Sequence, residues 1–125
     1  MFVVCIPVGL LSGFLVVSDA PMLWQFPLVF LGVLLTVAIP EEVMFRGILQ
    51  NLIAKKTNVS FALVGTSLMF GVSHFNNDLD LRYFGLATYA GLVLGWIYHR
   101  TSSVAAPSIV HALVDSIWIC FFVRH

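Results

Sequence analysis

The sequence predicts an all-α fold, a polytopic membrane helix bundle with about five transmembrane helices. Of the 125 residues, 60% are hydrophobic and only 10% are charged, and the mean hydropathy is +1.01. A soluble domain is roughly half apolar and a quarter charged, and one of this size leaves a large share of its surface in water. The apolar residues fall into five stretches that are separated by short polar connections, which is the pattern of successive spans.

The first two stretches are justified by what precedes and interrupts them. Residues 2–17 are expected to form a retained span, because a signal peptide needs a positively charged start and no Lys or Arg precedes Arg46. The second span is expected over 28–54, with residues 22–27 at the membrane interface. Pro40 lies inside this second span and predicts a kink or a helix restart there.

The remaining stretches are expected to complete the bundle, at residues 60–75, 83–98 and 104–123. The connections carry most of the charge: residues 55–58, 76–80 and 99–103. None of them is long enough to form a second domain, so residues 1–125 are predicted to form a single domain with a motif-bearing core at 28–123.

Charge and cysteine content exclude several classes of function. Six Lys and Arg balance six Asp and Glu, so the formal net charge is zero and no basic surface for nucleic acid is predicted. The high apolar content excludes a disordered chain. Cys5 and Cys120 lie in apolar stretches without metal-ligand spacing, so the sequence supports neither a disulfide framework nor a structural zinc site.

Ionisable residues inside the expected spans are the first indication of function. An ionised Asp or Arg in mid-membrane costs roughly 2.5–3.5 kcal/mol on translocon scales. The residues concerned are Glu41, Glu42, Arg46, His74, His111 and Asp115. Glu42 and Arg46 lie four apart, so they share a helix face and are expected to form an ion pair. Asp115 lies one turn from His111, where it orients the imidazole or points with it at one ligand.

Glu41, His74 and His111 are hardest to explain as structural residues. Helix geometry turns Glu41 about 100° from Glu42, away from the arginine, and Phe70 lies one turn before His74. Taken alone, the Glu42–Arg46 pair is structural, and a single histidine such as His74 is most simply hydrogen-bonded within the bundle. Jointly, a carboxylate and two imidazoles on three helices can activate a water and stabilise an oxyanion, which predicts peptide-bond hydrolysis in the membrane.

Three motifs support this prediction. The segment Glu41–Arg46 (EEVMFR) resembles the EExxxR motif of the type II CAAX prenyl endopeptidase family, also called the CPBP or Abi intramembrane proteases. Phe70–His74 (FGVSH) resembles its FxxxH motif, and His111–Asp115 (HALVD) resembles its HxxxN/D motif. The motifs occur in family order on separate apolar stretches. HExxH, GxGD and GxSG, the motifs of other protease classes, are absent from the sequence.

The resemblance implies roles for these residues within a single intramembrane protease-like domain. Glu41 and His74 would activate the water, His111 and Asp115 would form the oxyanion side, and Glu42, Arg46 and Phe70 would support the geometry. Eukaryotic members usually have Asn where this chain has Asp115, and an ionised Asp only accepts hydrogen bonds, so orienting His111 is its expected role. No cofactor is favoured. The alternative is a catalytic Zn²⁺ with three ligands, Glu41, His74 and His111.

The expected partners are the lipid bilayer and a protein or peptide substrate, with no nucleic acid. The resemblance implies an integral protein of a prokaryotic cell membrane that cleaves near the C-terminus, or in the membrane-embedded part, of its substrate. An export or sorting tail and a bacteriocin-like peptide both fit. Two alternatives stay open: a non-catalytic immunity or binding protein that uses the same polar cavity, and a proton-coupled transporter, which five spans without a repeat disfavour.

Overall fold

The computed structural model describes residues 2–13, 15–18, 23–75 and 80–124. Within this part of the chain the elements join into five continuous helices and one short strand pair, so the all-α prediction is confirmed apart from that pair. The helices are α1 (Phe2–Leu11), a long helix over Leu23–Lys56, α5 (Val59–Ser73), α6 (Leu81–Thr101) and α7 (Ala105–Phe121). The strands are β1 (Leu15–Val17) and β2 (Phe122–Arg124).

The first expected span is wrong in its extent. Helix α1 ends at Leu11 after ten residues, which is about 15 Å at 1.5 Å per residue and half of a hydrocarbon core. Gly13 has a φ of +69° and turns the chain. Strand β1 then pairs antiparallel with β2, with Leu15 opposite Arg124 and Val17 opposite Phe122. The last predicted span, 104–123, is also shortened: helix α7 ends at Phe121 and the chain continues into β2.

The long helix continues through Pro40 without a restart. It consists of a 3₁₀ turn (Leu23–Gln25), α2 (Phe26–Val33), a π-helical turn (Leu34–Ala38), α3 (Ile39–Glu42), a second π-helical segment (Val43–Gln50) and α4 (Asn51–Lys56). In an α-helix a proline ring clashes with the carbonyl four residues earlier. The carbonyl four residues before Pro40 belongs to Thr36, which lies in the π-helical turn Leu34–Ala38. Both residues that flank α3 keep helical dihedral angles. The predicted restart at Pro40 is therefore wrong, and a change of hydrogen-bonding register replaces it.

The remaining helices begin and end close to the expected positions. The Asn58 side chain caps α5 by accepting from the Phe61 N–H at 2.8 Å. The Asp80 side chain caps α6 and pairs with Arg82, whose hydrogen bonds hold the pKa of Asp80 below its usual value. Helix α6 ends at Thr101, and the next residue, Ser102, has a φ of 51°. Of the expected connection at 76–80, residues 76–79 lie outside the described residues, as do Met22 of the expected interfacial segment and the chain segment 19–21.

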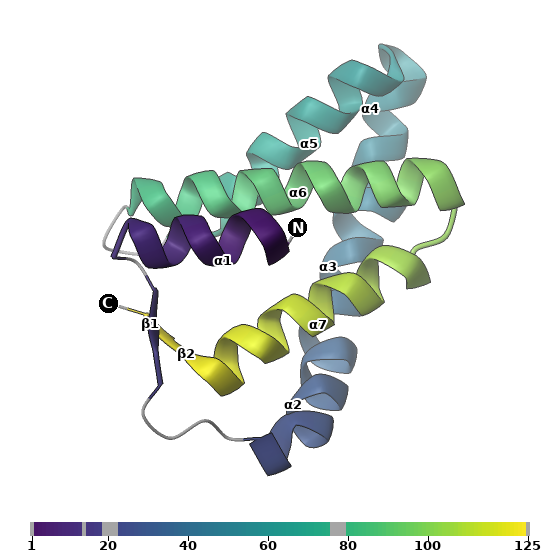
Figure 1. The fold of residues 1–125 in the computed structure, drawn as a ribbon. Helices are drawn as coiled ribbons and strands as arrows, with labels where there is room; N and C mark the ends of the chain where they lie inside the picture. Colours follow the sequence, from purple (N-terminus) through teal and green to yellow (C-terminus); the bar gives the residue numbers. More distant parts are fainter. Residues whose placement is uncertain (1, 14, 19–22, 76–79, 125) are drawn as a thin grey trace.

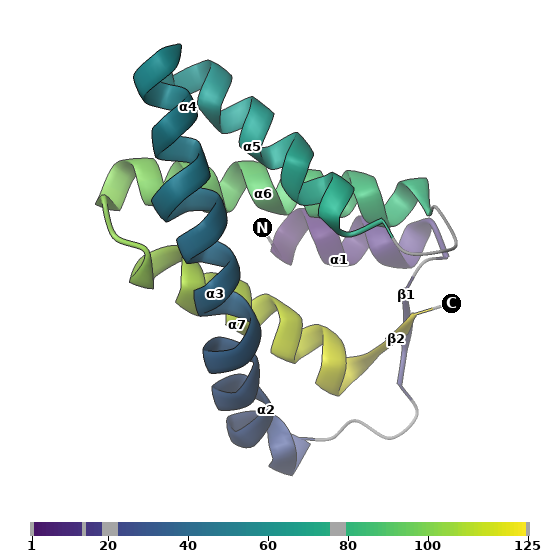
Figure 2. The ribbon, with the colours of Figure 1, turned by 180° about the vertical axis from the view of Figure 1, so that it is seen from behind.

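The helices cross one another at steep angles (Figures 1 and 2). Helix α6 lies between α1 and α5, and the long helix crosses both α6 and α7. The strand pair joins the end of α7 to the segment that follows α1. Glu41 to Arg46 in the long helix therefore lie where it passes α6 and α7.

Polarity is inverted relative to a soluble protein. The Glu42 and Arg46 side chains are completely buried, whereas Leu28 is 75% exposed and Phe61 is 62% exposed. One helix in the described part of the chain, Leu23–Lys56 with 34 residues, is long and apolar enough to cross a membrane. Two shorter apolar helices accompany it, Val59–Ser73 and Ala105–Phe121. The five-span arrangement stays a prediction, and the single-domain prediction for residues 1–125 also remains untested.

Candidate active site

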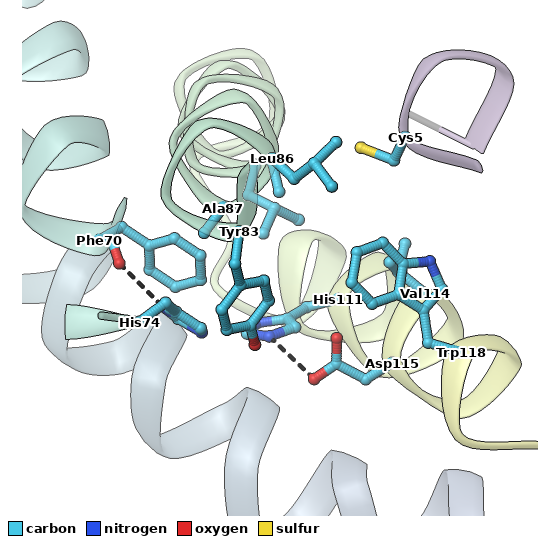
Figure 3. Close-up of a pocket in the computed structure, with 12 residues that line it drawn as sticks. Cys5, Phe70, His74, Tyr83, Leu86, Ala87, His111, Val114, Asp115 and Trp118 are labelled. Atoms are coloured by element: carbon cyan, nitrogen blue, oxygen red, sulfur yellow. Dashed lines mark hydrogen bonds and ion pairs between the residues drawn. The ribbon is translucent and has the colours of Figure 1, made fainter. Parts of the chain in front are cut away.

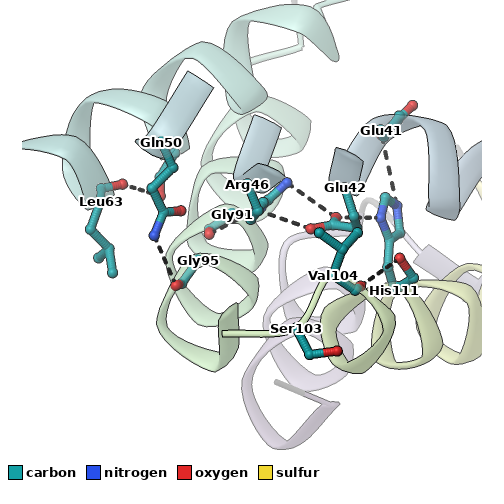
Figure 4. Close-up of polar contacts among 12 residues, drawn as sticks. Glu41, Glu42, Arg46, Gln50, Leu63, Gly91, Gly95, Ser103, Val104 and His111 are labelled. Carbon is teal, nitrogen blue, oxygen red and sulfur yellow. Dashed lines mark hydrogen bonds and ion pairs between the residues drawn. The ribbon is translucent and has the colours of Figure 1, made fainter. Parts of the chain in front are cut away.

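The imidazole of His111 is the centre of a polar cluster between the long helix and α7. Its Nδ1 lies 2.8 Å from Glu42 Oε1, and its Nε2 lies 3.4 Å from Asp115 Oδ2 and 3.9 Å from Glu41 Oε2. Figure 4 shows both glutamates directed at this ring from the long helix. Three of the predicted site residues are thus brought to one imidazole, which is itself only 4% exposed.

Glu42 is held in place by two buried partners. Arg46 Nη1 donates to Glu42 Oε1 at 3.1 Å, and Arg46 Nε lies 3.0 Å from Glu42 Oε2. The predicted ion pair between these residues is therefore confirmed. Because Glu42 also accepts from His111, its two oxygens are occupied by cationic or N–H groups. Its carboxylate is placed to hold His111 rather than to take a proton from a water.

Two carboxylates contact opposite nitrogens of the His111 ring. Asp115, which was expected to orient the imidazole, lies 3.4 Å from Nε2, and Glu42 accepts from Nδ1 at 2.8 Å. A carboxylate accepts, so Nδ1 carries a hydrogen, and Nε2 faces Asp115 and Glu41. An imidazolium at His111 donates from both nitrogens, whereas a neutral ring donates from Nδ1 alone.

Arg46 and Phe70 connect the cluster to the rest of the bundle. Arg46 Nη2 donates to the Gly91 carbonyl at 3.1 Å, and its guanidinium lies 4.6 Å from the centre of the Phe70 ring. The Phe70 ring also lies edge-on to His111, with centroids 5.7 Å apart, and 4.4 Å from the His74 ring. Phe70 therefore contacts one residue from each of the three motifs, as its supporting role requires.

His74 ends α5 and has a defined tautomer when it is neutral. Its Nδ1 lies 2.8 Å from the Phe70 carbonyl oxygen. A carbonyl only accepts, so Nδ1 carries the hydrogen and Nε2 carries the lone pair. Ser73 Oγ lies 3.2 Å from the same Nδ1, so it is not placed to deliver its proton to the Nε2 lone pair. The Glu41 carboxylate interacts electrostatically with His74 as well as with His111 and Asp115.

A small pocket lies beside these groups (Figure 3). It offers about 40 Å³ to the centres of water-sized molecules, and about 10–15 Å³ suffices for one water. Its walls combine four of the predicted site residues, Phe70 among them, with mostly apolar side chains: Cys5, Phe70, His74, Tyr83, Leu86, Ala87, Ala90, Leu94, His111, Val114, Asp115 and Trp118. Glu41 lies beside this lining, across His111, with 30% of its side chain exposed. Its Oε2 is buried and has no hydrogen-bond partner among the described residues.

The alternative zinc site requires three ligands that face one point. Among the described residues, no group of three His, Cys, Asp or Glu side chains has an arrangement that could hold a metal ion. The residues present therefore do not fit that centre without rearrangement.

Glu42, Arg46 and Gln50 form a buried polar row along one face of the long helix. The sequence analysis did not identify Gln50 as its third member. Gln50 is 5% exposed, and its Nε2 donates to the Gly95 carbonyl at 3.1 Å, one turn beyond the bond from Arg46 to Gly91. The signal was present, because Gln50 follows Arg46 by the same four residues that separate Arg46 from Glu42. Tyr83 and Trp118 also line the pocket, and their place there has no local sequence signal.

Comparisons with known proteins identify the family that the chain resembles. The family model described as Type II CAAX prenyl endopeptidase Rce1-like matches residues 23–117. The protein named "Putative membrane peptidase YdiL" from Bacillus subtilis (strain 168) is 32% identical over 76 residues, 61% of this chain and 30% of that protein. "Uncharacterized protein YpbD" from the same organism is 30% identical over 86 residues, 69% of this chain and 41% of that protein. The chain thus spans less than half the length of these curated relatives, and no solved structure matches it.

Proposed function

Because the chain belongs to the Rce1-like type II CAAX prenyl endopeptidase family, we propose that it is an intramembrane endopeptidase that hydrolyses a peptide bond with an activated water. The observation that carries the proposal is the position of His111. It lies within 4 Å of three carboxylates and shares a water-sized pocket with His74. A structural histidine needs one such partner, whereas a hydrolytic site needs several groups around one reacting centre.

The membrane setting of the proposal is supported by the inverted polarity of the fold. Large apolar side chains face outward along the long helix, while the charged side chains of Glu42 and Arg46 are fully buried. Charges inside a membrane protein face the bundle interior and pair with one another. We place the protein as an integral component of the cell membrane, and its relatives in Bacillus agree with a prokaryotic membrane.

Glu41 and His74 are the proposed water-activating groups. Glu41 Oε2 has no hydrogen-bond donor among the described residues, so it can accept one from a water. His74 presents its Nε2 lone pair because Nδ1 donates to the Phe70 carbonyl. A carboxylate and an imidazole that share a water can take its proton as it attacks a carbonyl, and later return it to the leaving amine. No metal is required for this sequence of transfers.

His111 is the proposed donor to the oxyanion, with Asp115 and Glu42 holding the ring. Glu42 accepts from Nδ1, and this leaves Nε2 as the atom that faces the site. The ring donates from Nε2 to the oxyanion as an imidazolium, since a neutral ring with its hydrogen on Nδ1 has only a lone pair there. Arg46 neutralises Glu42 and fixes its position through two contacts. A donor placed beforehand where negative charge develops stabilises the transition state without reorganising at the moment of reaction.

The proposed substrate is a protein or peptide whose scissile bond enters from the membrane. A bond near the substrate's C-terminus, or in its membrane-embedded part, suits a site enclosed by helices. Processing of an export or sorting tail, or of a bacteriocin-like peptide, is the corresponding cellular role.

Replacement of Glu41 tests the proposal. The full chain, purified in detergent, should cleave members of a peptide library. Glu41→Gln keeps the shape but removes the base, so kcat should fall by about 10²–10⁴-fold. Asp80→Asn is the matched control: it removes a carboxylate away from the site and retains a capping side chain, and its kcat should stay within about twofold of the unmodified chain.

Two outcomes would contradict parts of the proposal. Unchanged turnover in Glu41→Gln, with circular dichroism showing a folded protein, would remove Glu41 from the mechanism. Loss of cleavage on treatment with a strong chelator, with recovery on adding Zn²⁺, would replace the metal-free mechanism and leave the endopeptidase assignment intact.

A further inference from the structure

Two neighbouring cavities share a wall made by Tyr83 and Trp118. The inner cavity is the pocket that contains His74, His111 and Asp115. The outer cavity measures about 190 Å³ and has five lining residues: Leu15, Tyr83, Trp118, Ile119 and Phe122. Because two side chains line both cavities, the outer cavity adjoins the pocket that holds the candidate catalytic groups. Figure 3 shows Tyr83 and Trp118 among the residues that line the inner cavity.

The two cavities differ in what they can hold. An apolar cavity of about 150 Å³ binds benzene, and about 10–15 Å³ suffices for a water. The inner cavity, at about 40 Å³, therefore has room for water molecules but not for a large side chain. The outer cavity, at about 190 Å³, has room for a side chain of the size of leucine or phenylalanine. Its walls are aliphatic or aromatic, so an apolar group is the one it suits.

Residues outside the family match build most of the outer cavity. The matched region is 23–117, and of the five lining residues only Tyr83 lies within it. Leu15 is anchored by Cys5 and Leu86 in one buried cluster, and Phe122 is paired with Val17 in the strand ladder. The groups proposed for the chemistry lie in the matched region, whereas the outer cavity is built mostly from residues outside it.

The outer cavity lies within reach of a substrate held at the catalytic groups. The Tyr83 and His74 ring centroids are 5.7 Å apart, and an extended chain advances about 3.3 Å per residue. We propose that the outer cavity is a specificity subsite. It takes a large apolar side chain of the polypeptide substrate, one or two residues from the bond hydrolysed, and Ile119 and Phe122 set its size. This inference rests on the proposed endopeptidase function.

Variants of Ile119 test the subsite. Ile119 is 50% exposed, so its replacement disturbs the core little. Ile109, on the same helix, is 47% exposed and lines neither cavity. A cleaved peptide is varied at single positions among Ala, Leu and Phe. Ile119→Trp fills the cavity and should lower kcat/KM for the Leu and Phe peptides by about tenfold relative to the Ala peptide. Ile119→Ala should shift the preference towards Phe, and Ile109→Trp should leave the ranking unchanged.

A binding measurement separates failure of the subsite from failure of the proposed function. The same peptides, made with a non-hydrolysable bond, are titrated against the unmodified chain and the three variants. The unmodified chain could fail to cleave and still bind the peptides in order of side-chain size, with Ile119→Trp abolishing that order. This result would contradict the endopeptidase proposal and support the subsite. Identical peptide rankings for Ile119→Trp and Ile109→Trp in both assays would overturn the subsite. That is also the result expected if the cavity holds only a lipid or detergent chain.

Discussion

The Glu42 carboxylate is bound from one side by Arg46 and from the other by His111, and all three side chains are buried. Moving an unpaired charge into such an interior is unfavourable, so the two charged partners depend on each other. Arg46 adds a hydrogen bond to the Gly91 carbonyl and a ring contact with Phe70. At the scale of single residues, the arginine is what allows a carboxylate to hold the His111 imidazole from inside the bundle.

Removal of Arg46 alone should therefore be more harmful than removal of the ion pair. Arg46→Met should lower the free energy of unfolding by about 3–5 kcal/mol, because it leaves the Glu42 charge buried without a cation. The double variant Glu42→Gln with Arg46→Met keeps an acceptor for His111 but carries no buried charge, so it should recover part of that loss. Chemical unfolding in detergent, followed by circular dichroism, measures both. A double variant less stable than Arg46→Met would contradict the account.

Among the elements, helices α5 and α6 approach each other closely at Gly91. A Cβ at position 91 would lie 3.1 Å from the Cα and 3.3 Å from the carbonyl oxygen of Ser67, so backbone occupies the space. Small residues allow helices to come this close in membrane bundles. The approach also presents the Gly91 carbonyl to Arg46 and the Gly95 carbonyl to Gln50, so the packing of α6 positions the buried polar row of the long helix.

Two glycines of α6 should respond oppositely to the same substitution. Gly91→Ala should destabilise the protein by about 1–3 kcal/mol, because the added methyl group meets backbone. At Gly85 a Cβ has no heavy atom within 4 Å. Gly85→Ala should instead stabilise the helix by about 0.8–1 kcal/mol, through helix propensity. Thermal unfolding of the two variants in one detergent provides the comparison, and equal shifts of the same sign would refute the close-packing explanation.

For the molecule as a whole, apolar side chains face outward and the charged pair faces inward. Leu35 and Leu52, both on the long helix, are 57% and 50% exposed. In water such a surface would promote association. In a bilayer it is the favoured arrangement, because lipid chains cover the apolar residues while the interior pairs the charges.

The effect of an added charge on membrane insertion should depend on its depth along the long helix. Leu35→Lys puts an ammonium well inside the expected span and should raise the insertion free energy by up to about 2.5–3.5 kcal/mol. Leu52→Lys, close to Lys55 and Lys56, should have a small effect because its ammonium can extend to the headgroups. Carbonate extraction of membranes that contain each variant measures the retained fraction. Equal retention of the two variants would argue that the long helix does not span the bilayer.

Local spacing in the sequence was sufficient to predict the polar groups of the site. Glu42 and Arg46 pair because residues four apart share a helix face, whatever the helix packs against. The composition likewise indicated helices with apolar outer faces, and the motif resemblance agrees with the family that the comparison identifies. These properties depend on helix periodicity and on the chemistry of single side chains, so no tertiary information was needed.

Contacts between helices were decided by the tertiary structure alone. The Nδ1 partner of His111 is Glu42 rather than Asp115, α1 is short and ends before a strand, and the outer cavity joins Leu15 to Phe122 across the length of the chain. Each depends on crossing angles and on the pairing of segments more than 60 residues apart, for which the sequence carries no period. Helix geometry assigns a side chain to a face, but only packing determines which group it meets there.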